Sequence, residues 1–321
     1  MPLVSVIIPI FNSENFIARC AESLFQQSLK DIEYIFIDDA STDHSIEILE
    51  SVIECHPDIS SKTIIIREEE NRGQAAAFRK ALDVAKGKYV IKCDSDDTIE
   101  ASMYEDMYSF ANSNGFDVVI CDMMFIYPDG KKHQFLGRIN GTDDIKSILG
   151  NRIPTSLCNR LVKRNLFFAQ GFRYPSANMC EDFVYSLQLA YYSQSSGYIA
   201  KPYYSYYRHP ASFTWNGSMD AVLSKHNQTV QNITAGLEFL KEKGLDGKYK
   251  GDILRQCLFV KNGLKNQIGK TGIYPIWRKT FKESNVLIPF CAKIPFKERM
   301  VFLLIYFHLY GFYKYIKEKV M

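Results

Sequence analysis

The sequence predicts an α/β fold with a mostly parallel sheet flanked by helices, followed by an all-helical C-terminal region. In the first hundred residues, short β-branched and aromatic runs alternate with segments whose apolar residues recur at helical spacing. Such alternation is typical of parallel strands joined by right-handed helical crossovers. From about residue 219 the apolar residues repeat at helical spacing only, which predicts helices without strands.

Apolar runs and helical spacing also predict the positions of the individual strands and helices. Continuous apolar runs, typical of strands buried on both faces, predict strands at 4–9, 34–37, 63–66, 89–93 and 118–125. Helical spacing predicts helices near 16–25, 46–53, 75–85 and 184–191. A long helix is expected over 223–240, with Gly244 as its C-terminal cap.

The change of pattern also predicts how the chain divides. We place the boundary near residues 212–220. An α/β domain then covers 1–215, with a first half of 1–115 and a second half of 116–215, and a helical region covers 216–321.

Composition narrows the possible classes of protein. The chain has 321 residues, of which 46% are apolar, so it can form a sizeable core. Its net charge of +3 comes without a basic stripe, so we expect no nucleic-acid partner. Eight cysteines without a C-x-x-C pair predict buried free thiols in a reducing cytosol. A strand-like run from Leu3 leaves no room for a signal peptide, and no apolar stretch reaches the roughly 20 residues of a bilayer span. We therefore expect a cytoplasmic protein.

Two acidic clusters follow predicted strands. The run 38–43 (Asp-Asp-Ala-Ser-Thr-Asp) follows the second strand, and 94–97 (Asp-Ser-Asp-Asp) follows the fourth. Ligands of open α/β sheets bind beyond the carboxyl ends of the strands. Adjacent desolvated carboxylates need a cation or strong donors, and a divalent cation that shares substrate phosphates would satisfy them. Helix capping by Ser41 or Asp43 is the alternative for the first cluster, but it leaves the second unexplained.

Known nucleotide-binding loops are missing. The sequence contains no G-x-x-x-x-G-K-[ST] motif, and no G-x-G-x-x-G follows the first strand. A bound nucleotide would therefore be held by carboxylates, a metal and basic side chains rather than by a glycine-rich loop.

Four motifs in register resemble the family 2 glycosyltransferases of GT-A fold. They are the run 4–12, the turn 38–43, Asn71-Arg72-Gly73 and the cluster 94–97. Their order and spacing match over roughly the first 210 residues. The resemblance makes 1–215 a GT-A catalytic domain, with 1–115 as its nucleotide-binding half and 116–215 as its acceptor half. The family usually has Gly where this chain has Ala40.

The resemblance also implies roles for single residues. Asp39 would accept a hydrogen bond from a uracil imide, Asp94 would face the ribose, and Asp96 would bind the Mn²⁺ or Mg²⁺ that bridges the diphosphate. The other nucleotide-sugar contacts that it implies in this half are Pro9 and Phe11, which would flank the base, with Asn71, Arg72 and Ser95.

A carboxylate pair, Glu181-Asp182, opens the helix predicted over 184–191. The resemblance makes Asp182 the catalytic base and Glu181 an acceptor contact. In inverting transfer one base is enough, because the metal stabilises the charge on the leaving diphosphate and no general acid is required. The alternative is that both carboxylates merely stabilise the start of the helix.

Basic residues complete the expected site. Arg160 occupies a position where the family usually has Lys, and Arg208 and His209 follow a tyrosine-rich run at 203–207. The resemblance implies that Arg160 and Arg208 contact the nucleotide-sugar and that His209 contacts the metal or phosphate. The alternative is an aromatic strand followed by a solvated arginine.

These features predict transfer of one sugar from a nucleotide-sugar to an acceptor hydroxyl, and Asp39 beside Phe11 indicates a donor of the UDP type. The Gln-x-x-Arg-Trp signature of processive synthases is absent. By analogy with the family, the acceptor is a saccharide or lipid-linked saccharide in the assembly of cell-surface polysaccharide or glycolipid. Two alternatives stay open: a sugar nucleotidyltransferase, and a non-catalytic subunit that binds nucleotide-sugars.

The C-terminal segment suggests a membrane contact. Residues 300–313 are almost continuously apolar and aromatic, and lysines or arginines lie on both sides within 297–319. As a helix, 14 residues would reach only about 21 Å, too short to cross the hydrocarbon core. Two readings stay open: an interfacial helix on the inner face of the cell membrane, or a helix buried against the rest of the chain.

Overall fold

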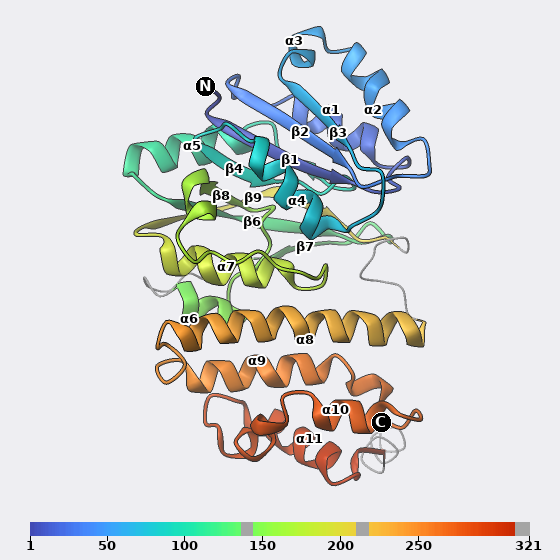
Figure 1. The fold of residues 1–321 in the computed structure, drawn as a ribbon, viewed down its shortest axis with the longest axis vertical. Coiled ribbons are helices and arrows are strands. Elements are labelled where there is room, and N and C mark those ends of the chain that lie inside the picture. The colour runs from blue at the N-terminus through green and yellow to red at the C-terminus, as the bar shows by residue number, and fades with distance from the viewer. Residues whose placement is uncertain (136–143, 210–217, 312–321) are drawn as a thin grey trace.

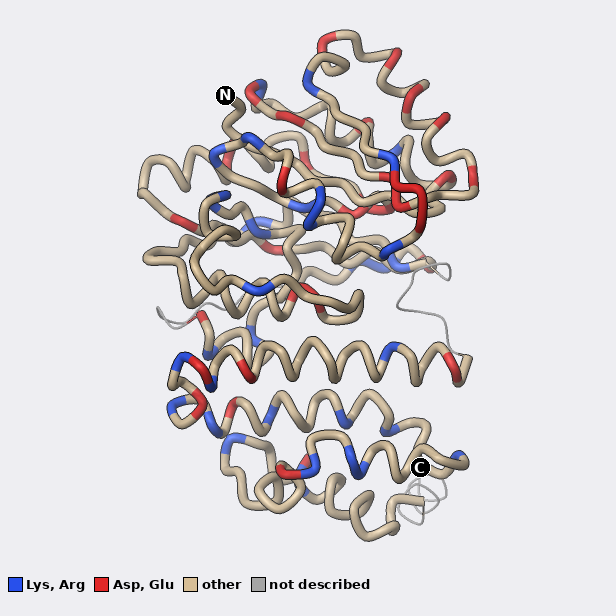
Figure 2. Tube along the Cα trace, in the orientation of Figure 1, with Lys and Arg blue, Asp and Glu red and all other residues tan. Residues whose placement is uncertain are grey.

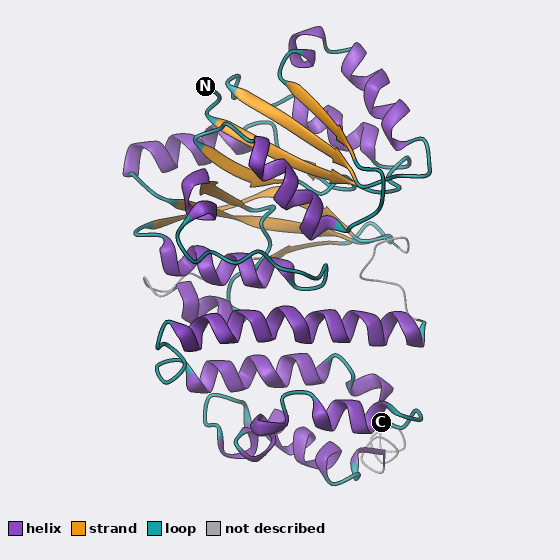
Figure 3. Ribbon diagram, in the orientation of Figure 1, coloured by secondary structure: helices purple, strands orange, loops and turns teal. Residues whose placement is uncertain are grey.

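The computed structural model describes residues 1–135, 144–209 and 218–311. Figure 1 shows a sheet with helices on both faces, and a stack of helices, α8 to α11, beyond one of these faces. Figure 3 shows that all strands lie in the α/β part. The predicted α/β fold with a C-terminal helical region is therefore confirmed.

The first half of the sheet is parallel, as predicted. Its strands are β1 (Val4–Ile10), β2 (Ile32–Asp38), β3 (Thr63–Arg67) and β4 (Tyr89–Lys92), in the order β3-β2-β1-β4. The helices α1 (Ile17–Phe25), α2 (Ser45–Glu54), α3 (Pro57–Ser60) and α4 (Gln74–Val84) connect them. Strand residues alternate between two cores, one on the side of α1 and α2 and one on the side of α4.

The second half of the sheet is mixed. Its elements are β5 (Thr98–Ile99), α5 (Met103–Asn114), β6 (Val118–Ile126), β7 (Lys132–Phe135), α6 (Asp144–Leu149), β8 (Arg160–Lys163), the 3-10 helix η1 (Arg164–Phe168), α7 (Glu181–Tyr192) and β9 (Ser196–Tyr207). The sheet continues β4-β8-β6-β9-β5, and β7 pairs with β6. Because β8 runs antiparallel to both β4 and β6, the purely parallel part of the sheet ends at β4.

The helical region consists of α8 (Met219–Glu242), α9 (Lys250–Asn262), α10 (Ile273–Lys279) and α11 (Phe296–Tyr306), with 3-10 turns at 265–267, 282–286 and 288–290. The predicted cap Gly244 lies just beyond α8 with a left-handed φ of 68°, a conformation that glycine adopts at little cost. Trp277, Phe302 and Leu258 are central members of a separate core in α9–α11.

Helix α8 packs directly on α7, so it shares a core with the α/β part. Ile233, Phe239 and Leu240 of α8 belong to the same cluster as Phe183 of α7. The two helices approach closely at Gly236, where an added Cβ would lie 2.6 Å from the ring of Phe183. The first helix after the proposed boundary therefore also supports the helix that begins with Glu181 and Asp182.

The apolar C-terminal run forms part of α11. Its Phe302 and Ile305 are buried in the core of α9–α11, whereas Met300 and Phe307 are exposed. Residues 312–321, with three of the flanking lysines, lie outside the described part. Within the described ranges, none of the helices combines the length and the apolar character that a bilayer span requires.

Candidate active site

The loops after β1 and β2 are joined to each other at the carboxyl edge of the sheet. The side-chain oxygen of Asn12 accepts a hydrogen bond from the backbone N–H of Thr42 at 2.9 Å, and Ser41 Oγ accepts one from the N–H of Asn12. Asp43 accepts from the N–H groups of Glu14 and Ser45. Asp43 therefore ties the start of α2 to the loop before α1, in line with the capping alternative for this residue.

Asp39 holds the loop that follows β3. It is buried, and its two oxygens accept the backbone N–H groups of Arg72 at 2.8 Å and Gly73 at 2.7 Å. Burial raises the pKa of Asp39, and these two bonds partly oppose that rise. The side chain of Arg72 is exposed and pairs with Glu70.

The backbone conformation of Ala40 explains why the family that the chain resembles usually has glycine at this position. Ala40 has a φ of 59°, in the left-handed region, where a Cβ costs about 1–2 kcal/mol. Gly73 also has a positive φ, 84°, and an added Cβ there would lie 1.9 Å from the side chain of Asn178. The loop at 71–73 thus lies directly against the segment that precedes Glu181.

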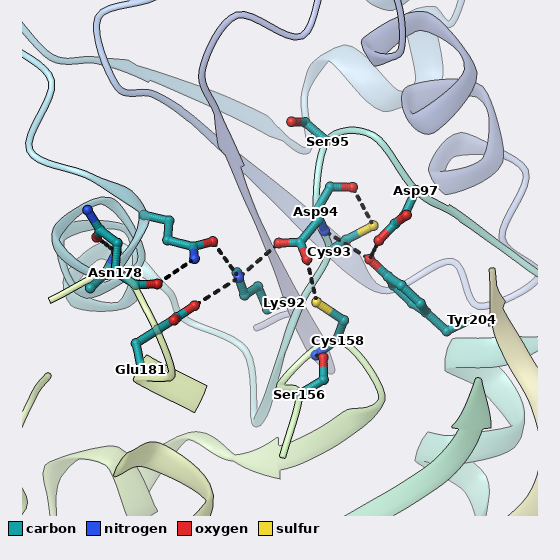
Figure 4. A network of polar contacts seen from close by, with 12 residues as sticks. Lys92, Cys93, Asp94, Ser95, Asp97, Ser156, Cys158, Asn178, Glu181 and Tyr204 are labelled. Carbon is teal, nitrogen blue, oxygen red and sulfur yellow. Dashed lines mark hydrogen bonds and ion pairs between the residues drawn. The ribbon is translucent and has the colours of Figure 1, made fainter. Parts of the chain in front are cut away.

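The cluster after β4 separates into carboxylates with different surroundings. Asp97 is fully buried and accepts hydrogen bonds from Tyr204 Oη at 2.7 Å and from the N–H of Tyr207 at 2.8 Å. Asp94 faces the opposite way, toward Lys92 and the thiol of Cys158 (Figure 4). Asp97 therefore holds β9 against the cluster, and Asp94 belongs to the network around α7.

Asp96 lies beside His209, and the family resemblance implied that both contact a metal or phosphate. The imidazole Nε2 is 2.8 Å from Asp96 Oδ2, and burial raises the pKa of this carboxyl. The ring of His209 packs on Phe16 with centroids 4.3 Å apart. Its Nδ1 is buried and has no hydrogen-bond partner among the described residues.

Arg19 is a residue that the sequence analysis missed. Its guanidinium donates to the backbone oxygen of Asp96 at 2.6 Å and lies 3.7 Å from the ring centroid of Tyr207. It is the only basic residue of α1. An isolated arginine in the first turn of an amphipathic helix, close in sequence to the end of the first strand, was the available signal.

Asp96 and His209 supply part of the ligand set that the Mn²⁺ or Mg²⁺ implied by the resemblance would need. Asp96 Oδ2 and His209 Nε2 are two suitable ligands in contact with each other. Over the described ranges, no three His, Cys, Asp or Glu side chains gather closely enough to hold a metal by themselves. The two residues fit a cation that takes its remaining ligands from substrate phosphates and water, as Mg²⁺ sites commonly do.

Glu181 and Asp182 form the first turn of α7, after Cys180 with its left-handed φ of 59°. Burial raises the pKa of Glu181 to about 8, with a further rise from the charge of Asp182. Burial also raises the pKa of Asp182 to about 6, and Lys92 opposes this rise. Asp182 Oδ1 is buried and accepts no hydrogen bond from the described residues, while the backbone of Leu157 donates to the carboxylate and lowers its pKa.

The segment before this pair is held from two helices. Asn232 of α8 donates to the backbone oxygens of Ala177 and Met179, and Gln228 of α8 accepts the N–H of Asn178. From the other side, Gln74 of α4 donates to the backbone oxygen of Asn178. The approach to Glu181 and Asp182 is thus fixed by α4 and α8 together.

The remaining predicted residues are more scattered. Arg160 is buried, donates to the backbone oxygen of Pro154 and faces Asp182 and Asp144; burial lowers its pKa to about 10. Arg208 is exposed and lies over the rings of Phe125 and Tyr127. Four others lie along the strand-end edge: Pro9 pairs with Ile37 within the sheet, Phe11 is 48% exposed, Asn71 is exposed, and Ser95 Oγ lies 2.7 Å from Ser13 Oγ.

Comparisons with known proteins agree with this architecture. The family model described as Glycosyl transferase family 2 matches residues 5–173. Cholesterol galactosyltransferase of Borreliella burgdorferi is 28% identical over 258 residues, which cover 75% of this chain and 68% of the relative.

Solved structures show the same fold. Residues 1–349 of S. aureus TarS in complex with UDP-GlcNAc match with a TM-score of 0.63 and 17% identity, over all of this chain and 91% of that one. The chain spans 54% of a longer TarS structure, with a TM-score of 0.69, 18% identity and 97% of this chain covered. The mannosyltransferase PcManGT of Pyrobaculum calidifontis, in complex with GDP-Man and Mn²⁺, matches with a TM-score of 0.54 and 15% identity, over 96% of this chain and 87% of that one.

The bonds of Asp39 generate a prediction about stability. Asp39→Ala leaves two backbone N–H groups without their acceptor, so the free energy of unfolding should fall by about 1–3 kcal/mol. Urea unfolding followed by circular dichroism measures this change. Asp83→Ala is the control, because Asp83 is half exposed and forms an ion pair with Arg79 on the same helix, and it should leave stability nearly unchanged. Equal losses in the two variants would contradict the role of Asp39.

Proposed function

The chain belongs to glycosyl transferase family 2, and from this premise we propose that it is an inverting enzyme that transfers one sugar from a UDP-sugar to an acceptor hydroxyl. The observation that carries the proposal is the shared contact of Asp94 and Glu181 with Lys92. This contact joins the strand-end cluster to the carboxylate pair of α7. A donor-binding edge and a candidate base therefore belong to one connected site.

The acceptor hydroxyl attacks the anomeric carbon from the face opposite the diphosphate. As the new C–O bond forms, Asp182 takes the hydroxyl proton and the nucleoside diphosphate leaves with the electron pair of the broken bond. Asp96 and His209 would hold the Mn²⁺ or Mg²⁺, which stabilises negative charge on the leaving diphosphate when bound. The guanidinium of Arg19 braces the backbone of Asp96, and Glu181 would contact the acceptor.

Other residues bind the donor in this proposal. The exposed ring of Phe11 is available to stack on the base. Each Asp39 oxygen accepts one backbone hydrogen bond and retains a second lone pair for a uracil imide. The remaining proposed contacts with the nucleotide-sugar are Pro9, Asn71, Arg72, Asp94, Ser95, Arg160 and Arg208. A UDP-sugar donor is also in line with the UDP-GlcNAc bound to TarS.

The acceptor is proposed to be a saccharide or a lipid-linked saccharide, in the assembly of cell-surface polysaccharide or glycolipid. A sterol-glycosylating relative supports an acceptor at a lipid surface. The chain would work in the cytoplasm, with a peripheral contact on the inner face of the cell membrane through 297–319.

Release of nucleoside diphosphate tests the function. The enzyme should release UDP from a UDP-sugar together with a glycosylated acceptor, whereas a nucleotidyltransferase would release pyrophosphate and a binding subunit neither. Asp182→Asn should lower kcat by about 10²–10⁴-fold with nearly unchanged affinity for UDP. Loss of UDP binding with retained turnover would assign Asp182 to the donor instead.

The pH profile follows from the ionisation of the base. Asp182 must be ionised to accept the proton, and burial raises its pKa to about 6. The value of kcat/KM should therefore fall as the pH drops through about 6 and level off above it. Initial rates across pH 5 to 9 measure this. A profile that stays flat down to pH 5 would exclude Asp182 as the base.

The metal ligands generate a separate prediction. EDTA should abolish transfer, and added Mn²⁺ or Mg²⁺ should restore it. Asp96→Ala and His209→Ala should each weaken the dependence of UDP binding on the metal, which isothermal titration calorimetry measures without any turnover. Full activity in EDTA would show that the transfer needs no metal.

Charge distribution supports the membrane contact. Residues 250–321 contain 14 Lys and Arg against four Asp and Glu, whereas residues 1–249 contain 25 against 32. Figure 2 shows this excess of basic positions along α9 to α11. Large aromatic side chains are exposed in the same region: Phe290 is 84% and Phe296 70% exposed. Arg299 lies near both, because its guanidinium donates to the backbone oxygen of Pro289 and lies over the ring of Phe296. Aromatic rings with neighbouring cations suit an anionic bilayer surface.

Flotation with liposomes tests this contact. The chain should float with vesicles that contain anionic lipid, and Phe290→Ser with Phe296→Ser should reduce the bound fraction. Substitution is preferable to truncation, because α11 contributes Phe302 to the core. Phe168→Ser is the matched control, since Phe168 is 46% exposed in the α/β part. A wild-type chain that stays in the soluble fraction at low salt would exclude the membrane contact.

A further inference from the structure

Lys92 occupies a position where the sheet pattern calls for an apolar side chain. Val90 of β4 belongs to the core on the α4 and α7 side, and Ile91 to the opposite core. By this alternation residue 92 faces the α4 and α7 side, and Lys92 is only 3% exposed. An unpaired ammonium costs several kcal/mol in such surroundings. A lysine at this position therefore depends on specific partners.

Those partners come from three different segments. Lys92 Nζ lies 2.8 Å from Asp94 Oδ1, 3.2 Å from Gln74 Oε1 and 3.8 Å from Glu181 Oε1. Figure 4 shows the ammonium at the centre of this network, between Asp94 and Glu181. Asp94 and Gln74 lie within hydrogen-bond distance of the ammonium, and Glu181 forms a longer ion pair with it. Lys92 thus joins the strand-end cluster, α4 and α7.

The ammonium of Lys92 and the neighbouring carboxylates change one another's pKa. Burial by itself lowers the pKa of Lys92, but the neighbouring acidic groups, Asp94 first, raise it well above its usual value. The ammonium in turn lowers the pKa of Glu181 and Asp182, against the effect of burial. Asp94 raises the pKa of Asp182, whereas a backbone hydrogen bond from Leu157 and the charge of Arg160 lower it. Lys92 is the larger of these two cationic influences.

We propose that Lys92 is a positioning residue for the transfer reaction, whose buried ammonium fixes Asp94 and Glu181 in one arrangement and keeps Asp182 available as the base. The inference rests on the proposed function. Lys92 is too deeply buried to act on the substrate itself, so it works through the carboxylates that it contacts. Because Asp94 belongs to the donor side and Glu181 to the acceptor side, one ammonium aligns both halves of the site.

Lys92→Met tests this proposal, because methionine keeps an unbranched side chain without the charge. The acid limb of the kcat/KM profile should move up by about one pH unit or more, and activity should recover toward the wild-type value at high pH. A loss of activity that is the same at every pH would reduce Lys92 to a packing role. Lys163→Met is the control, because Lys163 also ends a strand and pairs with an aspartate, Asp117, at the opposite end of β4. Its profile should match the wild type.

Unfolding experiments give a readout that needs no activity. The pKa of Glu181 is raised on folding, so its ionisation opposes folding as the pH rises from about 5 toward 8. Without the ammonium this opposition should grow, so Lys92→Met should lose more stability at pH 8 than at pH 5. Adding Glu181→Gln should recover much of that loss.

The two experiments separate the possible failures. A double variant that is no more stable than Lys92→Met, or a loss that is independent of pH, would overturn the electrostatic link. If the wild-type protein releases no nucleoside diphosphate but Lys92→Met shows the expected pH-dependent loss of stability, the proposed function is wrong and the electrostatic link between Lys92 and Glu181 is still supported. If the wild-type protein transfers sugar and the kcat/KM profile of Lys92→Met has the same pH dependence as the wild type, the positioning role is wrong and the proposed function is still supported.

Discussion

Burying a carboxylate costs several kcal/mol unless donors or cations compensate it, and this cost organises the edge of the sheet. Asp39 is compensated by two backbone N–H groups, and Asp97 by a tyrosine hydroxyl and a backbone N–H. These two carboxylates hold loops in place. Asp182, in contrast, has a buried oxygen without a hydrogen bond from the described residues. Asp39 and Asp97, with hydrogen bonds to both oxygens, thus support the loops, whereas Asp182 keeps one oxygen without such a bond.

Helix α7 connects this edge with the helical region. Its first turn contains Glu181 and Asp182, and its Phe183 packs against α8 at Gly236. Helix α8 also holds the preceding segment through Asn232 and Gln228. The position of the candidate base therefore depends on residues that lie after residue 216 in the sequence, and α8 is structurally part of the site's support.

The helical region and the α/β part carry opposite net charge. Acidic residues outnumber basic ones up to residue 249, and the excess reverses beyond it. Buried polar contacts and a shared core hold α8 against α7, whereas the excess of basic over acidic positions lies along α9–α11 (Figure 2). This charge difference agrees with the partners proposed for the two regions: a metal and phosphates at the sheet edge, and an anionic surface at the far helices.

The sequence by itself determined the alternation of strands and helices, the parallel strands of the first half and the polar residues after them, because these depend on local periodicity and on residues close in the chain. The family resemblance implied a shared metal or phosphate site for Asp96 and His209, and the two side chains lie 2.8 Å apart. Only the tertiary structure decided which partner each carboxylate has. The position of β8 between β4 and β6, the contact of Arg19 with Asp96, and the burial of Lys92 between Asp94 and Glu181 all join segments far apart in sequence. The spacing of apolar residues within one segment carries no information on such contacts. They depend on how the helices and strands pack against one another.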